Sequence, residues 1–143
     1  MASRQPGSRP RGIEARLARA ARQVVAWERA RGTRVELTLL DAPRMRRLNY
    51  RTTGRRGITD VIAFRLPQPD GTLVGDVYLC PAAAARWVDE DPGAPSLAAE
   101  LVRLAVHGTL HVLGYDHPEG PGRTRSAMWR RQEAYLRRLA RAR

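Results

Sequence analysis

Cysteine is nearly absent from this sequence, and lysine is entirely absent. Cys80 is the only cysteine among 143 residues, so the chain cannot form an intramolecular disulfide, and nothing in it indicates an oxidising compartment. All 26 basic residues are arginine, a bias that a coding sequence rich in G and C would produce. We therefore interpret Cys80 as a small buried apolar residue and not as part of a disulfide framework.

Long apolar runs are also missing, since none approaches the roughly 20 residues that a transmembrane helix requires. Residues 1–12 are rich in Arg, Ser, Pro and Gly and lack the apolar centre of a secretory signal, so we expect a disordered basic tail there. The remaining residues, 13–143, are expected to form a single domain. We expect a cytoplasmic protein with no membrane partner.

Acidic residues are few, and the 14 that are present leave a net charge of +12. A basic excess of this order favours polyanionic partners such as RNA or DNA. Part of the charge could reflect base composition alone. Arginine nevertheless suits phosphate contacts, because its planar guanidinium offers two parallel donors.

Hydrophobic periodicity predicts helices and strands in one α+β domain. Helices are expected at 13–31, 42–50, 81–88, 97–113 and about 128–139. Strands are expected at 35–40, 58–66 and 72–79, and the turn at 69–71 predicts that the last two form a hairpin. The segment 97–113 is apolar nearly all round, which is typical of a helix buried in the core.

All three histidines of the chain fall within eleven positions. His107 and His111 are four residues apart, so on a helix they project from one face, roughly 6 Å from each other. A chain that reverses at Gly114 can bring His117 back toward them. A single histidine is usually a hydrogen-bonded polar residue, but three at this spacing indicate a metal site. Three nitrogen ligands with an open fourth position are typical of catalytic zinc.

Hydrolysis is the reaction class that an open zinc position suggests, because the metal lowers the pKa of bound water to about 7. The residue after His107 is Gly108, where zinc proteases of the His-Glu-x-x-His type carry their general base. The histidine spacing also fits part of the metzincin pattern. A zinc hydrolase of a peptide or ester therefore stays open as an alternative, weakened by the missing glutamate.

The segment His107–His117, HGTLHVLGYDH, resembles the signature of the YbeY-type rRNA maturation endoribonucleases. Segments 48–49, 59–64 and 74–80 are also similar to blocks of that family. The resemblance implies a zincin-like fold, a small mixed β-sheet flanked by helices, in which a central buried helix carries two of the three zinc ligands. It also implies one Zn²⁺ per chain.

The same resemblance implies a function. It suggests a zinc-dependent, single-strand-specific endoribonuclease that acts in rRNA processing, notably 3′-end maturation of the small-subunit 16S rRNA, and in ribosome quality control. The implied partners are ribosomal RNA and the small ribosomal subunit, with a ribosomal protein or an assembly GTPase as a further partner. A non-catalytic ribosome-assembly factor that binds RNA and holds a structural zinc is the main alternative.

One departure from the family concerns its catalytic arginine. The family typically has an aromatic-Arg pair five or six residues before the Thr-Asp of the second strand, where this chain has Thr52 and Thr53. Arg51, Arg55 and Arg56 surround that gap, and each could hold a phosphate in a bidentate grip. We therefore take all three as candidate RNA-binding residues, and Arg55 and Arg56 also as candidate catalytic residues.

Asp116 is a further catalytic candidate because it lies beside the third histidine. Its carboxylate could orient an imidazole or a water molecule, or it could simply cap a turn. Asp60 and Asp76 fall within predicted strands, where aspartate is unfavoured, so each is expected to have a specific hydrogen-bonding task. These two residues could either stabilise the structure beneath the site or take part in catalysis.

Overall fold

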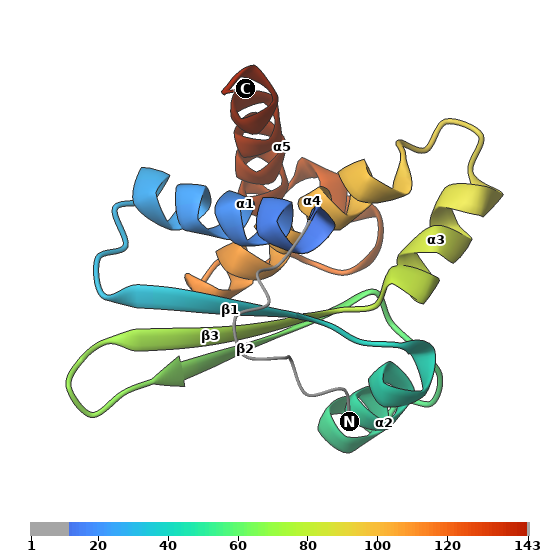
Figure 1. Ribbon diagram of the computed structural model, residues 1–143, viewed down its shortest axis with the longest axis horizontal. Coiled ribbons are helices and arrows are strands. Elements are labelled where there is room, and N and C mark those ends of the chain that lie inside the picture. Colours follow the sequence, from blue (N-terminus) through green and yellow to red (C-terminus); the bar gives the residue numbers. More distant parts are fainter. Residues whose placement is uncertain (1–11, 143) are drawn as a thin grey trace.

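The computed structural model describes residues 12–142, so nearly all of the tail expected over residues 1–12 lies outside the described part. The elements follow in the order α1 (Ile13–Trp27), β1 (Thr33–Leu39), α2 (Ala42–Thr53), β2 (Val61–Pro67), β3 (Leu73–Leu79), α3 (Pro81–Glu90), α4 (Leu97–Val112), the 3₁₀ helix η1 (Gly120–Arg125) and α5 (Ala127–Arg141). The predicted α+β fold is confirmed (Figure 1).

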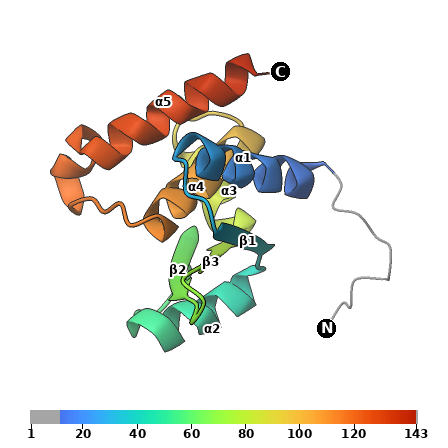
Figure 2. The same cartoon turned by 90° about the vertical axis from the view of Figure 1, so that its left-hand side faces the viewer.

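The three strands form one mixed sheet in the order β1-β3-β2. Strand β1 pairs parallel to β3, with Thr33 opposite Leu73, and β2 pairs antiparallel to β3, with Val61 opposite Leu79. The predicted hairpin is therefore confirmed. Helices α1, α4 and α5 lie on one side of the sheet and α2 lies on the other (Figures 1 and 2).

Helix α4 is the centre of the core. Eleven of its residues are buried, and it packs against α1, α3, α5 and all three strands. Two glycines allow it to approach β3 closely: Gly75 of β3 faces Val112 of α4, and Gly108 of α4 faces Val77 of β3. A β-carbon at Gly108 would lie 2.6 Å from a Val77 methyl group, so no larger residue fits without displacement. Helix α4 therefore turns the side that carries Gly108 toward the sheet.

Local capping explains several element boundaries. Asp41 accepts a hydrogen bond from the Arg44 amide at 2.9 Å, and Ser96 accepts one from the Ala99 amide at 3.1 Å, so both predicted helix caps are confirmed. Helix α2 continues to Thr53 and ends at Gly54, whose φ of 74° is left-handed. No helix in the described part of the chain has the length and apolar character needed to cross a bilayer.

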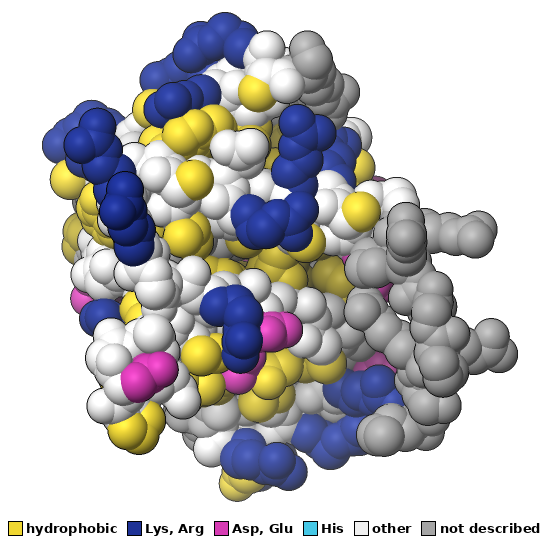
Figure 3. All heavy atoms as spheres, turned by 60° about the vertical axis from the view of Figure 1, so that its left-hand side comes forward, with side chains coloured by type: hydrophobic (Ala, Val, Ile, Leu, Met, Phe, Trp, Pro, Cys, Tyr) yellow, Lys and Arg dark blue, Asp and Glu magenta, His cyan; other side chains and the backbone are white. Residues whose placement is uncertain are grey.

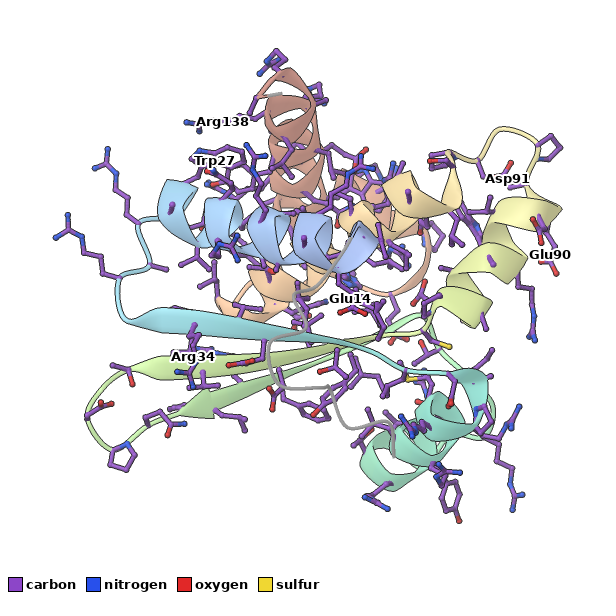
Figure 4. All side chains as sticks on the ribbon, viewed as in Figure 1. Glu14, Trp27, Arg34, Glu90, Asp91 and Arg138 are labelled. Atoms are coloured by element: carbon purple, nitrogen blue, oxygen red, sulfur yellow. The ribbon has the colours of Figure 1, made fainter. Side chains whose placement is uncertain are left out.

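Helix α1 ends at Trp27, four residues before the predicted end at Arg31. The helix stops because Arg29 adopts a φ of 54° and the Glu28 side chain turns toward other elements. Trp27 stacks on Tyr135 of α5, with 5.3 Å between ring centroids, and the Arg138 guanidinium lies 4.3 Å from the Trp27 ring centroid (Figure 4). The end of α1 is thus set by packing against α5.

We expect Gly108→Ala to lower the free energy of unfolding by about 1–3 kcal/mol, the usual cost of overpacking a core. Alanine favours helix by up to about 1 kcal/mol over glycine, but the added methyl meets the stiff, buried Val77 side chain. Urea unfolding measures the change. The double variant Gly108→Ala, Val77→Ala relieves the overlap and controls for it. Fully additive effects of the two substitutions would contradict this packing.

Candidate metal centre

The three histidines meet at one end of α4. His107 and His111 project from the last turns of this helix, and the chain then reverses at Gly114, whose φ is 101°, to bring His117 back. One ring nitrogen of each histidine lies within 4.8 Å of the other two. The Nε2 atoms of His107 and His111 are 3.1 Å apart. The predicted convergence of the three imidazoles is therefore confirmed.

Each imidazole has its Nδ1 atom beside a carbonyl oxygen, which can only accept a hydrogen bond. The pairs are His107 with Oε1 of Gln132 at 2.7 Å, His111 with the Tyr115 carbonyl at 3.0 Å, and His117 with the Pro118 carbonyl at 3.0 Å. Three such acceptors place the protons on Nδ1 and leave the Nε2 lone pairs free. Converging nitrogen lone pairs are the donor set that a transition metal or zinc ion takes, so these residues fit such an ion.

Burial favours the neutral form of His107 and His111. It lowers the pKa of His107 from 6.5 to about 4, even though the hydrogen bond with Gln132 acts in the opposite direction. Burial likewise lowers the pKa of His111. Since a metal binds only the neutral imidazole, both side chains are prepared for coordination at neutral pH.

The Tyr115 carbonyl that accepts from His111 is itself anchored by a network of side chains. The Tyr115 hydroxyl donates to Glu28 of α1 at 2.6 Å, and Glu28 also accepts from Tyr135 and, at 2.8 Å, from Arg131 of α5. Burial opposes ionisation of Glu28, but these three hydrogen bonds outweigh it and hold the pKa of Glu28 below its ordinary value. The turn after α4 is thereby tied to both neighbouring helices.

The three histidines line an open cleft of about 850 Å³ between α4, β2 and the segment after Gly114. Its other charged lining residues are the arginines Arg55, Arg65, Arg103 and Arg123 and the acidic residues Asp60, Glu100, Asp116 and Glu119. Burial raises the pKa of both Asp60 and Glu100. The cleft can therefore place a metal ion, carboxyl groups and guanidinium groups around one anionic substrate.

A family model described as "Endoribonuclease YbeY" matches residues 8–140. The chain belongs to the YbeY endoribonuclease family. A YbeY protein of an Anaeromyxobacter species is 38% identical over 141 residues, covering 95% of this chain and 70% of that protein.

Other YbeY relatives match over a shorter region. The Rhodococcus erythropolis YbeY protein is 38% identical over 96 residues, covering 59% of this chain and 52% of its own length. The chain thus spans about half the length of this relative. A Thermotoga maritima protein with a known solution structure has a TM-score of 0.63 and 25% identity, covering 92% of this chain and 85% of that one. The YbeY match and this likeness agree on the fold.

The structure also locates the other residues predicted for the YbeY-type site. Arg55 and Asp116 line the cleft, whereas Arg56 lies over the ring of Tyr50, 5.9 Å from its centroid, and Arg51 is exposed on α2. The Asp116 carboxylate accepts from the His117 amide at 2.9 Å, which is the turn-capping alternative. The proposed catalytic and RNA-binding roles of these residues stay predictions.

At the site of the family's arginine, Thr53 is engaged locally. Its hydroxyl donates to the Asn49 carbonyl at 2.7 Å and accepts from the Arg55 amide at 3.1 Å, so it closes the end of α2. Asn49 in turn donates to the Gly57 carbonyl at 3.1 Å, which ties the following loop to the helix. Thr53 therefore serves the loop and does not replace a guanidinium in the cleft.

The sequence did not predict a place in the site for two buried polar residues, Gln132 and Glu100. Gln132, which holds His107, is 1% exposed, and Glu100 is 6% exposed in the otherwise apolar α4. Their only signal was a polar residue on a face that periodicity assigns to the core, since Gln132 follows the buried Met128 by four positions. A buried polar side chain needs a hydrogen-bond partner, and the partner of Gln132 is His107, a candidate metal ligand.

We expect the metal-free protein to lose stability through His107 as the pH falls from about 6.5 to about 4. In this window the unfolded imidazole binds a proton and the buried one does not, so acidification favours unfolding by up to about 3 kcal/mol. Acidification has the opposite effect on stability through Asp60 and Glu100. Their pKa values are raised in the folded protein, so the folded state takes up these protons first. The difference between wild type and His107→Gln in urea unfolding isolates the histidine. Parallel pH profiles for the two proteins would rule this effect out.

Proposed function

We propose that this chain is a zinc-dependent endoribonuclease that cuts single-stranded RNA. The observation that carries the proposal is the convergence of three imidazole nitrogens in a cleft that four arginines also line. Membership of a family described as endoribonucleases supports the reaction, and the cleft supplies groups suited to it.

Zinc is the metal that we propose, one ion per chain. Three neutral imidazoles with no cysteine or carboxylate among them match catalytic zinc sites that leave a fourth position open. A bound zinc ion would lower the pKa of water and polarise a phosphoryl oxygen. His107, His111 and His117 would hold the ion, while Gln132 and the Tyr115 carbonyl would keep two of these rings oriented.

The protein's own contribution to phosphodiester cleavage is electrostatic. A phosphodiester gains negative charge in the transition state, and arginines placed around the metal centre stabilise that charge. The surface outside the cleft is also rich in arginine: on the face in Figure 3, arginine side chains surround an apolar area and acidic side chains are few. Such a surface attracts the sugar-phosphate backbone without regard to sequence.

We propose ribosomal RNA as the substrate, with 3′-end maturation of 16S rRNA and ribosome quality control as the settings. This part rests on the family alone. On the same ground we propose the cytoplasm as the compartment and the small ribosomal subunit as the partner. A ribosomal protein or an assembly GTPase is proposed as a further partner. The +12 charge is consistent with a polyanionic particle of this kind.

Peptide hydrolysis is less suited to this cleft. In proteases of the His-Glu-x-x-His type, the residue after the first histidine is the general base, but the corresponding Gly108 here faces Val77 in the core. A glutamate at this position would point into the sheet and not at a substrate. The nuclease proposal needs no group there.

We expect zinc-loaded protein to cleave a single-stranded rRNA oligonucleotide and to leave its duplex form intact. Removal of the metal with EDTA or the substitution His111→Ala should reduce the rate by more than about a hundredfold, because a metal centre supplies several kcal/mol of transition-state stabilisation. Gel analysis of end-labelled RNA measures the rate.

Two controls accompany this experiment. Restored zinc should recover the activity of the EDTA-treated wild type but not that of His111→Ala, and Trp87→Ala on the exposed face of α3 should cut at the wild-type rate. If His111→Ala retains full cleavage, the metal centre is not the active site. If wild type binds the strand but never cuts it, the chain acts as an assembly factor instead.

A further inference from the structure

The four arginines of the cleft differ in whether their guanidinium groups already have partners. Arg103 is paired with Glu133 at 2.8 Å and with Glu100 at 3.4 Å. Within the described part of the chain, Arg55, Arg65 and Arg123 have no ion pair and donate no side-chain hydrogen bond. An unpaired guanidinium keeps all its N–H donors available for a ligand.

Arg123 is distinguished by its neighbours. It belongs to η1, six residues after the third histidine, and its Cζ atom lies 5.6 Å from the ring centroid of Trp129. Its positive charge also acts on the acidic residues of the cleft: burial raises the pKa of Asp60 and Glu100, and Arg123 acts in the opposite direction on both. Arg123 is therefore an unpaired arginine that lines the cleft together with Asp60 and Glu100 and comes from the same segment after Gly114 as the third histidine.

The other two unpaired arginines lie elsewhere along the cleft. Arg65 of β2 lies near Gly114, with its Nη1 atom 3.4 Å from where a β-carbon of that glycine would be. Arg55 follows the end of α2. Both line the cleft, but neither belongs to the segment after Gly114 that carries the third histidine.

We propose that Arg123 holds the RNA phosphate at the metal centre of this chain, a role that the sequence alone suggested for Arg51, Arg55 or Arg56. The proposal rests on the proposed nuclease function for the identity of the anion. The need for such a residue follows from the cleft, because Asp60 and Glu100 line the same space and repel a phosphate. A guanidinium beside them offsets that repulsion and can bind two phosphate oxygens at once.

The test compares Arg123→Gln with Arg125→Gln in the zinc-loaded full chain. Arg125 lies in the same 3₁₀ helix, is also exposed and does not line the cleft, so it is a matched control. The binding probe is a single-stranded 2′-O-methyl oligonucleotide, followed by fluorescence anisotropy and checked on a gel to be intact after each measurement, and the cleavage probe is the unmodified RNA. Zinc content and thermal melting of each variant are measured in parallel.

We expect Arg123→Gln to weaken probe binding by about tenfold to a hundredfold, the effect of losing a charge-assisted bidentate contact. The slope of log K against log salt should fall by about 0.7, as for one lost phosphate contact on a single strand. Arg125→Gln should stay within about twofold of wild type. Arg123→Lys should restore the salt slope but cleave more slowly than wild type, because an ammonium cannot replace the bidentate fork.

Each remaining outcome has a definite meaning. If wild type cleaves and Arg123→Gln matches Arg125→Gln in binding and rate, the assignment of Arg123 is wrong and the nuclease proposal stands. If wild type never cleaves but Arg123→Gln alone weakens binding, the nuclease proposal fails and Arg123 remains a phosphate contact. If Arg123→Gln holds less zinc or melts at a lower temperature, and the smaller fraction of folded, zinc-loaded protein accounts for its weaker binding, Arg123 is structural and the assignment is overturned.

Discussion

Helix α4 and strand β3 lie so close that each places a glycine opposite a valine of the other. Gly108 of the helix faces Val77, and Gly75 of the strand faces Val112. This reciprocal contact fixes the rotation of α4 about its axis. At about 100° per residue, the flank next to Gly108 carries Glu100, Leu104, His107 and His111, and all four line the cleft. The position of the metal centre therefore follows from the packing of the core.

The metal ligands also depend on segments far away in the sequence. Gln132 of α5 accepts from His107, and the turn that accepts from His111 is tied to Glu28 of α1. Burial penalises the protonated forms of His107 and His111, which lowers their pKa values and favours the neutral imidazole that a metal binds. These contacts therefore orient His107 and His111 for an ion already in the metal-free protein.

Much of this arrangement could be predicted from the sequence because its signals are local. The four-residue step between His107 and His111 and the reversal at Gly114 are contained in a short segment, as are the caps at Asp41 and Ser96. The strands were identified by their β-branched and apolar residues, and their predicted limits differ from the structure by three residues or fewer.

What could not be predicted depends on tertiary contacts. The partner of Gln132 lies 25 positions away, and the early end of α1 follows from contacts of Trp27 and Glu28 with α5 and the turn after α4. Arg123 could not be singled out from the sequence because nothing in the local sequence places η1 beside the cleft. Arginine is so frequent in this chain that its functional members are distinguished only by geometry.

In the proposed metal centre, three Nε2 atoms of one chain hold a single zinc ion with a fourth position open. Zinc K-edge X-ray absorption of protein loaded with one equivalent of the metal tests it most directly. We expect three imidazole nitrogens at about 2.0–2.1 Å and one further oxygen ligand. A sulfur ligand from Cys80, a shell without imidazole, or a bound amount well below one zinc per chain would contradict the claim.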